Sequence, residues 1–122
     1  MKELPKREVP GPKSAELLEI SRKYEPPCMA DQVPVVWDHG EGVHVWDVDG
    51  NEYIDFTSGV LVTNLGHSHP HHVAAIQEQA GRLMNCYSFP TPERVTLSQR
   101  LTDLLPENLD KIFLLTTGAE AT

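Results

Sequence analysis

The residues best suited to bind a ligand are Thr117, Gly118 and Ala119, which directly follow the apolar run of residues 112–115 and Thr116. The unbroken apolar run predicts a strand buried on both faces, as in a parallel sheet, and the glycine and alanine predict a turn into a helix. Backbone N–H groups at the start of a helix have no partner within the helix, and the helix dipole favours an anion there. The pattern therefore favours a phosphate site, although many α/β proteins have such a corner and bind nothing at it.

A second stretch that could line a site is residues 57–66, where apolar residues lie between Gly59 and Gly66. Glycines at such positions indicate a backbone that turns sharply or lies close to another group. Two interpretations remain open from the residues alone. The stretch is either a buried connection between two layers or a loop that lines a mostly apolar pocket.

Four histidines occur within six residues, at His67, His69, His71 and His72. They suggest a metal site, but Pro70 suits the first position of a helix, so the four side chains would point in different directions. No acidic residue or cysteine joins them. We therefore expect no metal here, and predict a structural turn with one histidine that faces a pocket.

The composition argues against several classes of function. A net charge of −8 leaves no basic stripe for nucleic acid, and no apolar run is long enough to span a membrane. The charged first residues lack the apolar segment of a signal peptide, and Cys28 and Cys86 do not form a CxxC motif. We expect a cytoplasmic protein with two reduced thiols, while a disulfide between them stays open.

The elements that would position these stretches begin with residues 1–13, whose prolines and glycine predict an extended arm. Ser14 is expected to cap a short helix that the prolines at 26 and 27 end. Leu17, Ile20 and Tyr24 fall on one side of that helix. This apolar side favours an arm that lies on another surface over a disordered one.

A β-hairpin is predicted around Asp49-Gly50, which lies between the β-rich runs 43–48 and 52–56. Asp-Gly between such runs is a strong hairpin signal, because the favoured turn requires a positive φ.

Three residues of the same turn, Asp47, Asp49 and Asn51, also have the spacing with which a calcium loop begins. We reject that interpretation, because Glu52 stands where such a loop needs glycine and Ser58 where it needs a bidentate glutamate.

Two helices are predicted between the histidines and the corner at Thr117. The first starts at Pro70 and continues through residue 83 with apolar residues at helical spacing. The second follows Thr91 as N-cap, with Pro92 at its first position. Its buried stripe is expected to consist of four leucines, Leu97, Leu101, Leu104 and Leu105.

The predicted strand at 112–115 needs neighbours on both sides, and the alternating hairpin does not resemble them. We therefore interpret the chain as the N-terminal piece of a larger α/β enzyme. The ordered motifs of the chain resemble those of class III aminotransferases. These motifs are Gly42-Val43-x-x-x-Asp47-x-Asp49-Gly50-x-x-Tyr53-x-Asp55-Phe56, then Gly59, then Gly66-His67-x-His69-Pro70, then Thr117-Gly118-Ala119-Glu120-Ala121.

The resemblance implies the α/β fold of pyridoxal-phosphate-dependent transferases of fold type I, of which this chain is the N-terminal part. Residues 1–66 would form an arm and part of the small domain, including the hairpin. Residues 67–122 would begin the large domain that binds pyridoxal 5'-phosphate. Members of the family are homodimers, with sites at the subunit interface.

The resemblance also implies a transaminase that moves an amino group from an amine or amino acid to a 2-oxo acid. Residues 10–14 and 55–62 look most like the 4-aminobutyrate branch. Dialkylglycine decarboxylase is also similar, but it has Gln where this chain has Val60, which counts against decarboxylation.

By the same resemblance, Thr117, Gly118 and Ala119 would bind the cofactor phosphate, and Gly59 and Val60 would line the substrate pocket. The lysine that holds the cofactor lies downstream in the family, so no catalytic residue is expected here and the chain alone should be inactive. Two alternatives remain. One is a non-catalytic module that binds phosphate weakly or associates with a partner, and the other is a histidine-based metal-binding protein.

Overall fold

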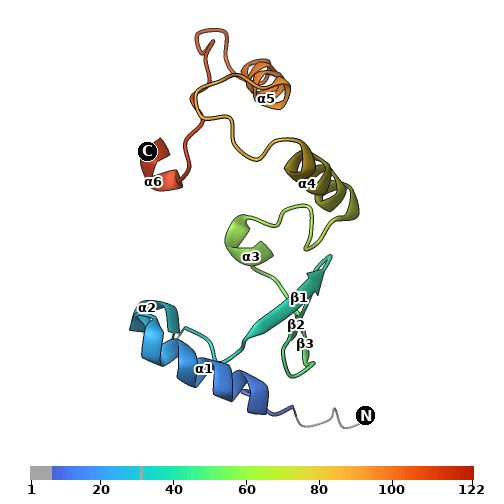
Figure 1. Cartoon of the computed structure of the whole chain (residues 1–122), viewed down its shortest axis with the longest axis vertical. Coiled ribbons are helices and arrows are strands. Elements are labelled where there is room, and N and C mark those ends of the chain that lie inside the picture. Colours follow the sequence, from blue (N-terminus) through green and yellow to red (C-terminus); the bar gives the residue numbers. More distant parts are fainter. Residues whose placement is uncertain (1–6, 31) are drawn as a thin grey trace. The chain divides into compact units, whose positions relative to one another are not determined.

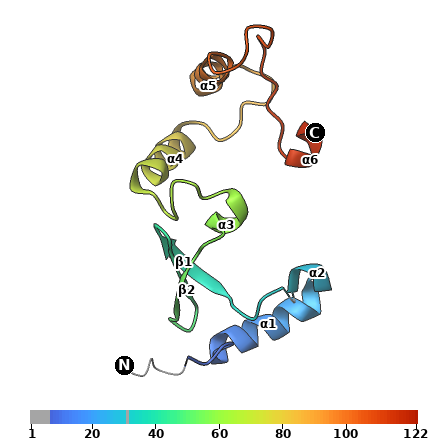
Figure 2. The same ribbon diagram turned by 180° about the vertical axis from the view of Figure 1, so that it is seen from behind.

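The computed structural model describes residues 7–30 and 32–122, which divide into two compact units, one that ends at Glu78 and the other Gln79–Thr122. Residues 1–6 of the predicted arm lie outside the described residues. Figures 1 and 2 show the elements from opposite sides. The first unit contains the helices α1 (Pro12–Tyr24), α2 (Pro27–Ala30) and α3 (Ser58–Leu61) and the strands β1 (Trp37–Glu41), β2 (His44–Asp47) and β3 (Glu52–Ile54). Helix α4 (Pro70–Arg82) continues into the second unit, which also contains α5 (Pro92–Thr102) and α6 (Gly118–Ala121).

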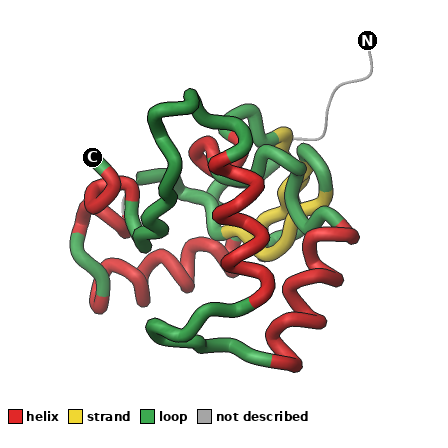
Figure 3. Tube along the Cα trace, turned by 90° about the horizontal axis from the view of Figure 1, so that it is seen from above, coloured by secondary structure: helices red, strands yellow, loops and turns green. Residues whose placement is uncertain are grey.

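The predicted hairpin is confirmed by an antiparallel β2–β3 pair in which Val45 faces Tyr53. Gly50 has a φ of 83°, and its N–H donates to the Asp47 carbonyl at 2.9 Å, as a tight turn requires. Strand β1, which the sequence did not predict, pairs antiparallel with β2 and completes a sheet in the order β1-β2-β3. These short strands are the yellow segments of Figure 3.

Helix α1 begins two residues before the predicted cap, so Ser14 is not its N-cap and Pro12 and Lys13 are not part of an extended arm. The N-cap is Gly11, which has no side chain to accept the free N–H groups. The Asp49 carboxylate of the hairpin turn accepts them instead, from Lys13 and Ser14, both at 2.9 Å. An acceptor from a distant turn thus replaces a local cap.

The side of α1 that packs inward also differs from the prediction. Leu18 is buried, whereas Leu17, Ile20 and Tyr24 are exposed. Leu18 and Val45 are the buried apolar side chains among the described residues, so the first unit has a small core.

The starts of the later helices are confirmed, but their burial is not. Helix α4 begins at Pro70, and Thr91 caps α5 by accepting a hydrogen bond from the Arg94 N–H at 3.3 Å. The predicted buried stripe of α5 is wrong, because Leu97, Leu104 and Leu105 are exposed and Leu101 is half-buried.

The predicted strand at 112–115 is also wrong. The described residues 111–115 form no strand, and Phe113 is 86% exposed. A strand of a parallel sheet is stabilised by hydrogen bonds to neighbours, and no other described segment supplies them. The described part of the chain therefore has mixed helices and a small antiparallel sheet.

Candidate functional site

The carboxylate of Asp55, just after β3, accepts four hydrogen bonds. Its Oδ1 accepts from the N–H and the hydroxyl of Thr57 at 2.8 and 2.7 Å. Its Oδ2 lies 2.7 Å from both the Gly59 nitrogen and Nε2 of His67. The Asp55 side chain is 2% exposed and that of His67 15%. A buried carboxylate thus links a loop to a histidine twelve residues further along the chain.

These contacts determine the protonation state of Asp55. Hydrogen bonds from Thr57 and then from His67 hold the pKa of the Asp55 carboxyl well below its usual range, and they outweigh burial, which raises it. Asp55 is therefore ionised at neutral pH, so Nε2 of His67 is the protonated nitrogen that donates to it.

The loop that Asp55 holds has an unusual backbone. The φ angles of Ser58, Gly59, Val60 and Leu61 are all positive, between 55° and 68°. Left-handed backbone costs about 1–2 kcal/mol per residue with a side chain, and a β-branched residue such as Val60 is a rare occupant. Such strain persists only where neighbouring contacts impose it, and it clusters at ligand sites.

The predicted substrate residues Gly59 and Val60 both belong to this left-handed turn, but they have different surroundings. The Gly59 N–H donates to Asp55, whereas the Val60 N–H donates to the Thr57 hydroxyl at 3.3 Å. The Val60 side chain is 79% exposed and lines an apolar groove of about 850 Å³.

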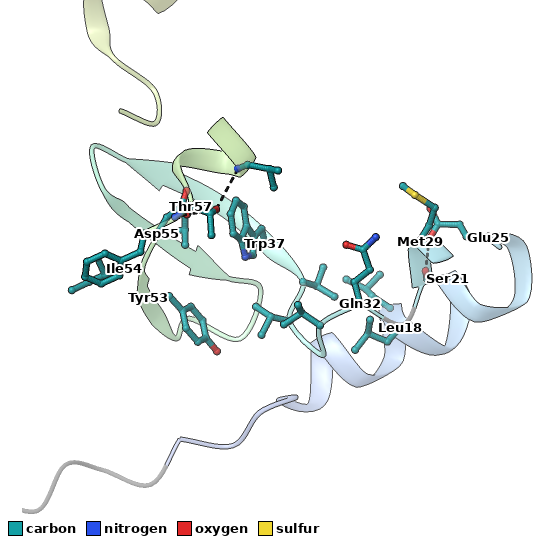
Figure 4. Close-up of a pocket in the computed structure, with 17 residues that line it drawn as sticks. Leu18, Ser21, Glu25, Met29, Gln32, Trp37, Tyr53, Ile54, Asp55 and Thr57 are labelled. Carbon is teal, nitrogen blue, oxygen red and sulfur yellow. Dashed lines mark hydrogen bonds between the residues drawn. The ribbon is translucent and has the colours of Figure 1, made fainter. Parts of the chain in front are cut away.

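This groove lies within the first unit. Its walls come from α1, α2 and the sheet, including Leu18, Met29, Trp37 and Tyr53, as Figure 4 shows. Apolar walls with a few polar groups are typical of sites for small molecules with aliphatic parts.

The corner at Thr117 forms the start of α6 and contains a capping box. The Thr117 hydroxyl accepts from the Glu120 N–H at 3.2 Å, and Oε2 of Glu120 accepts from the Thr117 N–H at 3.0 Å. Hydrogen bonds from the hydroxyls of Thr116 and Thr117 lower the pKa of Glu120. This role of Glu120 was not predicted from the sequence, although the T-x-x-E spacing signals it.

The capping box leaves two donors open. Among the described residues, the N–H groups of Gly118 and Ala119 have no hydrogen-bond partner. A Cβ built on Gly118 would meet nothing within 4 Å, so the turn has open space beside this residue. The corner therefore offers two adjacent N–H donors for the oxygens of an anion, beside the Glu120 carboxylate.

The structure separates the four histidines. His67 is bound to Asp55, while His69, His71 and His72 are exposed. Within residues 7–30 and 32–122, no group of three or more His, Cys, Asp or Glu side chains could hold a metal ion. The role of Asp55 was not predicted from the sequence. The Asp-x-Thr spacing that forms its turn was the available signal.

The two sets of predicted site residues belong to different units, with Gly59 and Val60 in the first and Thr117, Gly118 and Ala119 in the second. None of the helices in the described part of the chain has the length and apolar character needed to cross a membrane.

The chain is similar to known proteins over most of its length. Residues 27–122 match the family model described as "Aminotransferase class-III". The acetylornithine aminotransferase of Methanothermobacter thermautotrophicus is 41% identical over 109 residues, which are 88% of this chain and 27% of that protein. The 5-aminovalerate aminotransferase of Pseudomonas aeruginosa is 42% identical over 91 residues, 72% of this chain and 21% of that protein.

A solved structure gives the same result for the fold. The crystal structure of the acetylornithine aminotransferase from Elizabethkingia anophelis superposes with a TM-score of 0.78 at 39% identity, over 88% of this chain and 28% of that chain. The present chain thus spans about a quarter of the length of the relatives that it matches.

Proposed function

The chain belongs to the class III aminotransferase family, and we propose that it is the N-terminal part of a transaminase that depends on pyridoxal 5'-phosphate. The reaction transfers an amino group from an amine or amino acid to a 2-oxo acid. The observation that carries the proposal is the corner at Gly118 and Ala119, where two open N–H donors lie within the segment that matches the family.

The residues present fit a phosphate group. Gly118 and Ala119 would donate their N–H groups to it, and Thr117 would hold the start of α6 in place through the capping box. Glu120 fixes the same turn, since its carboxylate accepts the Thr117 N–H and the hydroxyls of Thr116 and Thr117. The ring of the bound cofactor supplies an electron sink for bond breaking at the amino-bearing carbon.

The left-handed turn would serve the amino donor. We propose that Gly59 and Val60 line the donor pocket, where the exposed Val60 side chain contacts an aliphatic part of the donor and excludes water from it. A donor with its amino group on a terminal carbon suits this role, and 4-aminobutyrate is our first candidate because residues 10–14 and 55–62 resemble that branch. The name of the relative that acts on 5-aminovalerate also fits this class.

The described lysines lie at the surface. Lys13 is exposed, Nζ of Lys23 lies 5.1 Å from the centroid of the exposed Tyr24 ring, and Nζ of Lys111 lies 3.3 Å from Asp110. A catalytic lysine must be desolvated or otherwise tuned to react at neutral pH. We therefore propose that the catalytic lysine belongs to the part of the protein that the relatives have beyond this segment. We also propose that the protein is a cytoplasmic homodimer.

The test compares the 122-residue chain with the full-length protein. Each is mixed with pyridoxal 5'-phosphate, and its visible spectrum is recorded. Borohydride reduction and mass spectrometry then locate any covalent adduct. The long protein should form one adduct and convert 4-aminobutyrate or 5-aminovalerate with 2-oxoglutarate, whereas the short chain should do neither. A specific adduct with turnover on the short chain would contradict the proposal.

An alternative is a non-catalytic module, whose specific support is that the donors at Gly118 and Ala119 are already open in this chain. A long protein without an adduct and without turnover of any amino donor would favour it.

A further inference from the structure

His67 and Asp55 connect the left-handed turn of α3 to the sheet. We propose that this pair positions Val60 for the amino donor, so that His67 determines the KM of the donor without touching it. The inference rests on the proposed function, in which Gly59 and Val60 line the donor pocket. It adds a positioning residue that the sequence motifs did not assign.

His67 is held independently of the turn. Its backbone pairs with Gly42, with the two N–H to carbonyl hydrogen bonds at 2.8 and 2.9 Å. Its ring makes an edge contact with Trp37 of β1, with 5.7 Å between ring centroids at an angle of 82°. The sheet therefore holds His67, and it also holds the Asp55 backbone, whose N–H donates to the Val43 carbonyl at 2.8 Å. Nε2 of His67 then orients the Asp55 carboxylate.

The turn depends on that carboxylate in two ways. Oδ2 accepts the Gly59 N–H directly. Oδ1 accepts the Thr57 hydroxyl, whose oxygen accepts the Val60 N–H. Both central amides of the left-handed run thus lead back to Asp55. Because positive φ is unfavourable for residues with side chains, a shift of Asp55 should let the turn relax and displace Val60.

Two substitutions separate the donor atom of His67 from its ring. His67→Phe keeps an aromatic edge against Trp37 but has no N–H for Asp55. His67→Gln loses the ring but keeps an N–H donor at a comparable reach. If the hydrogen bond from residue 67 to Asp55 positions Val60, His67→Gln should keep the KM of the amino donor close to that of wild type, whereas His67→Phe should raise it.

The chain offers a matched control in the pair of Asp38 and His39. Oδ2 of Asp38 lies 2.8 Å from Nδ1 of His39, but both side chains are exposed. The His39 ring stacks on Trp46, so His39→Phe also keeps its aromatic contact. Substitution there removes the same kind of hydrogen bond without reaching the turn.

The experiment measures kcat and KM for the amino donor in the full-length protein, with cofactor occupancy from the visible spectrum. We expect His67→Phe to raise the donor KM at least tenfold, with kcat and occupancy within threefold of wild type. His67→Gln should stay within threefold and His39→Phe within twofold in KM. A His67→Phe KM within twofold of wild type, or a His67→Gln variant as impaired as His67→Phe, would overturn the inference.

A structural measurement keeps the test independent of activity. Thr57→Val removes the hydroxyl that accepts the Val60 N–H. Because Thr57 is exposed, this variant tests the backbone of the turn if His67→Phe does not fold. Crystal structures of the variants should show that Val60 no longer has a positive φ. A positive φ at Val60 in both His67→Phe and Thr57→Val would overturn the inference, even in a protein without transaminase activity. Absence of activity in the wild type would instead contradict the proposed function.

Discussion

The Asp49 carboxylate accepts two hydrogen bonds from Ser14, which precedes it by 35 residues. The Ser14 N–H lies 2.9 Å and its hydroxyl 2.6 Å from Oδ2 of Asp49. Ser14 is completely buried, so water does not substitute for this acceptor. The hairpin turn thereby caps α1 and joins the N-terminal helix to the sheet.

The first prediction concerns the hydroxyl of this contact. Ser14→Ala should lower the free energy of unfolding by about 1 kcal/mol, because one buried hydrogen bond is lost and Asp49 keeps its contacts to the two amides. Urea unfolding of the full-length protein measures the change. Ser21→Ala in the same helix is the control, since the Ser21 hydroxyl donates to the carboxylate of Glu25 four residues away at the surface, and it should have a smaller effect. Equal effects of the two substitutions would show that the contact to Asp49 has no special role.

The second prediction concerns the space at the N-cap of α1. A Cβ on Gly11 would lie 2.4 Å from Cγ of Asp49, which is too close without a shift of the cap. Gly11→Ala should therefore destabilise the protein by roughly 1–3 kcal/mol, as overpacking does.

Gly81 supplies the control, because a Cβ there meets nothing within 4 Å and alanine is the better helix former. Gly81→Ala should leave the melting temperature unchanged or raise it. A Gly11→Ala protein as stable as wild type would mean that Asp49 does not occupy this position.

The third prediction concerns the hairpin turn. Gly50 has a φ of 83°, a region that costs a β-branched residue roughly 1–2 kcal/mol. Gly50→Val should lower the melting temperature of the full-length protein, and Gly50→Asn should lower it less, because asparagine tolerates positive φ. An unchanged melting temperature for the valine variant would argue against a tight turn at Asp49-Gly50.

The fourth prediction concerns pH. The pKa of Asp55 is lower in the folded protein than in the unfolded chain, where the pKa of an aspartate is about 4. Its ionised form therefore stabilises the fold fully above that value, and the contribution declines as the pH falls further. The difference in free energy of unfolding between wild type and Asp55→Asn should be present at pH 7 and should shrink below about pH 4.

Urea midpoints at each pH measure this difference, with Asp38→Asn as an exposed control that should have little effect at any pH. A wild-type advantage over Asp55→Asn that is the same at pH 3 and pH 7 would contradict the assignment.

Local signals in the sequence determined the parts of the structure that depend on neighbouring residues. The positive φ of Gly50 follows from an Asp-Gly pair between β-rich runs, and the starts of α4 and α5 follow from Pro70 and from Thr91-Pro92. These features form because a turn or a cap needs only contacts a few residues apart. The family resemblance, drawn from spaced motifs, is confirmed over residues 27–122.

Tertiary structure decided which of these residues meet. The predicted start of α1 was wrong because the acceptor of its free N–H groups is the distant Asp49. The hydrogen bond between Asp55 and His67 was not visible in any local spacing. The strand expected at 112–115 and the stripe expected on α5 were wrong for a related reason. An apolar run or stripe becomes a strand or a buried face only where another element supplies hydrogen bonds or apolar surface, and within the described residues Phe113 and Leu104 have no such cover.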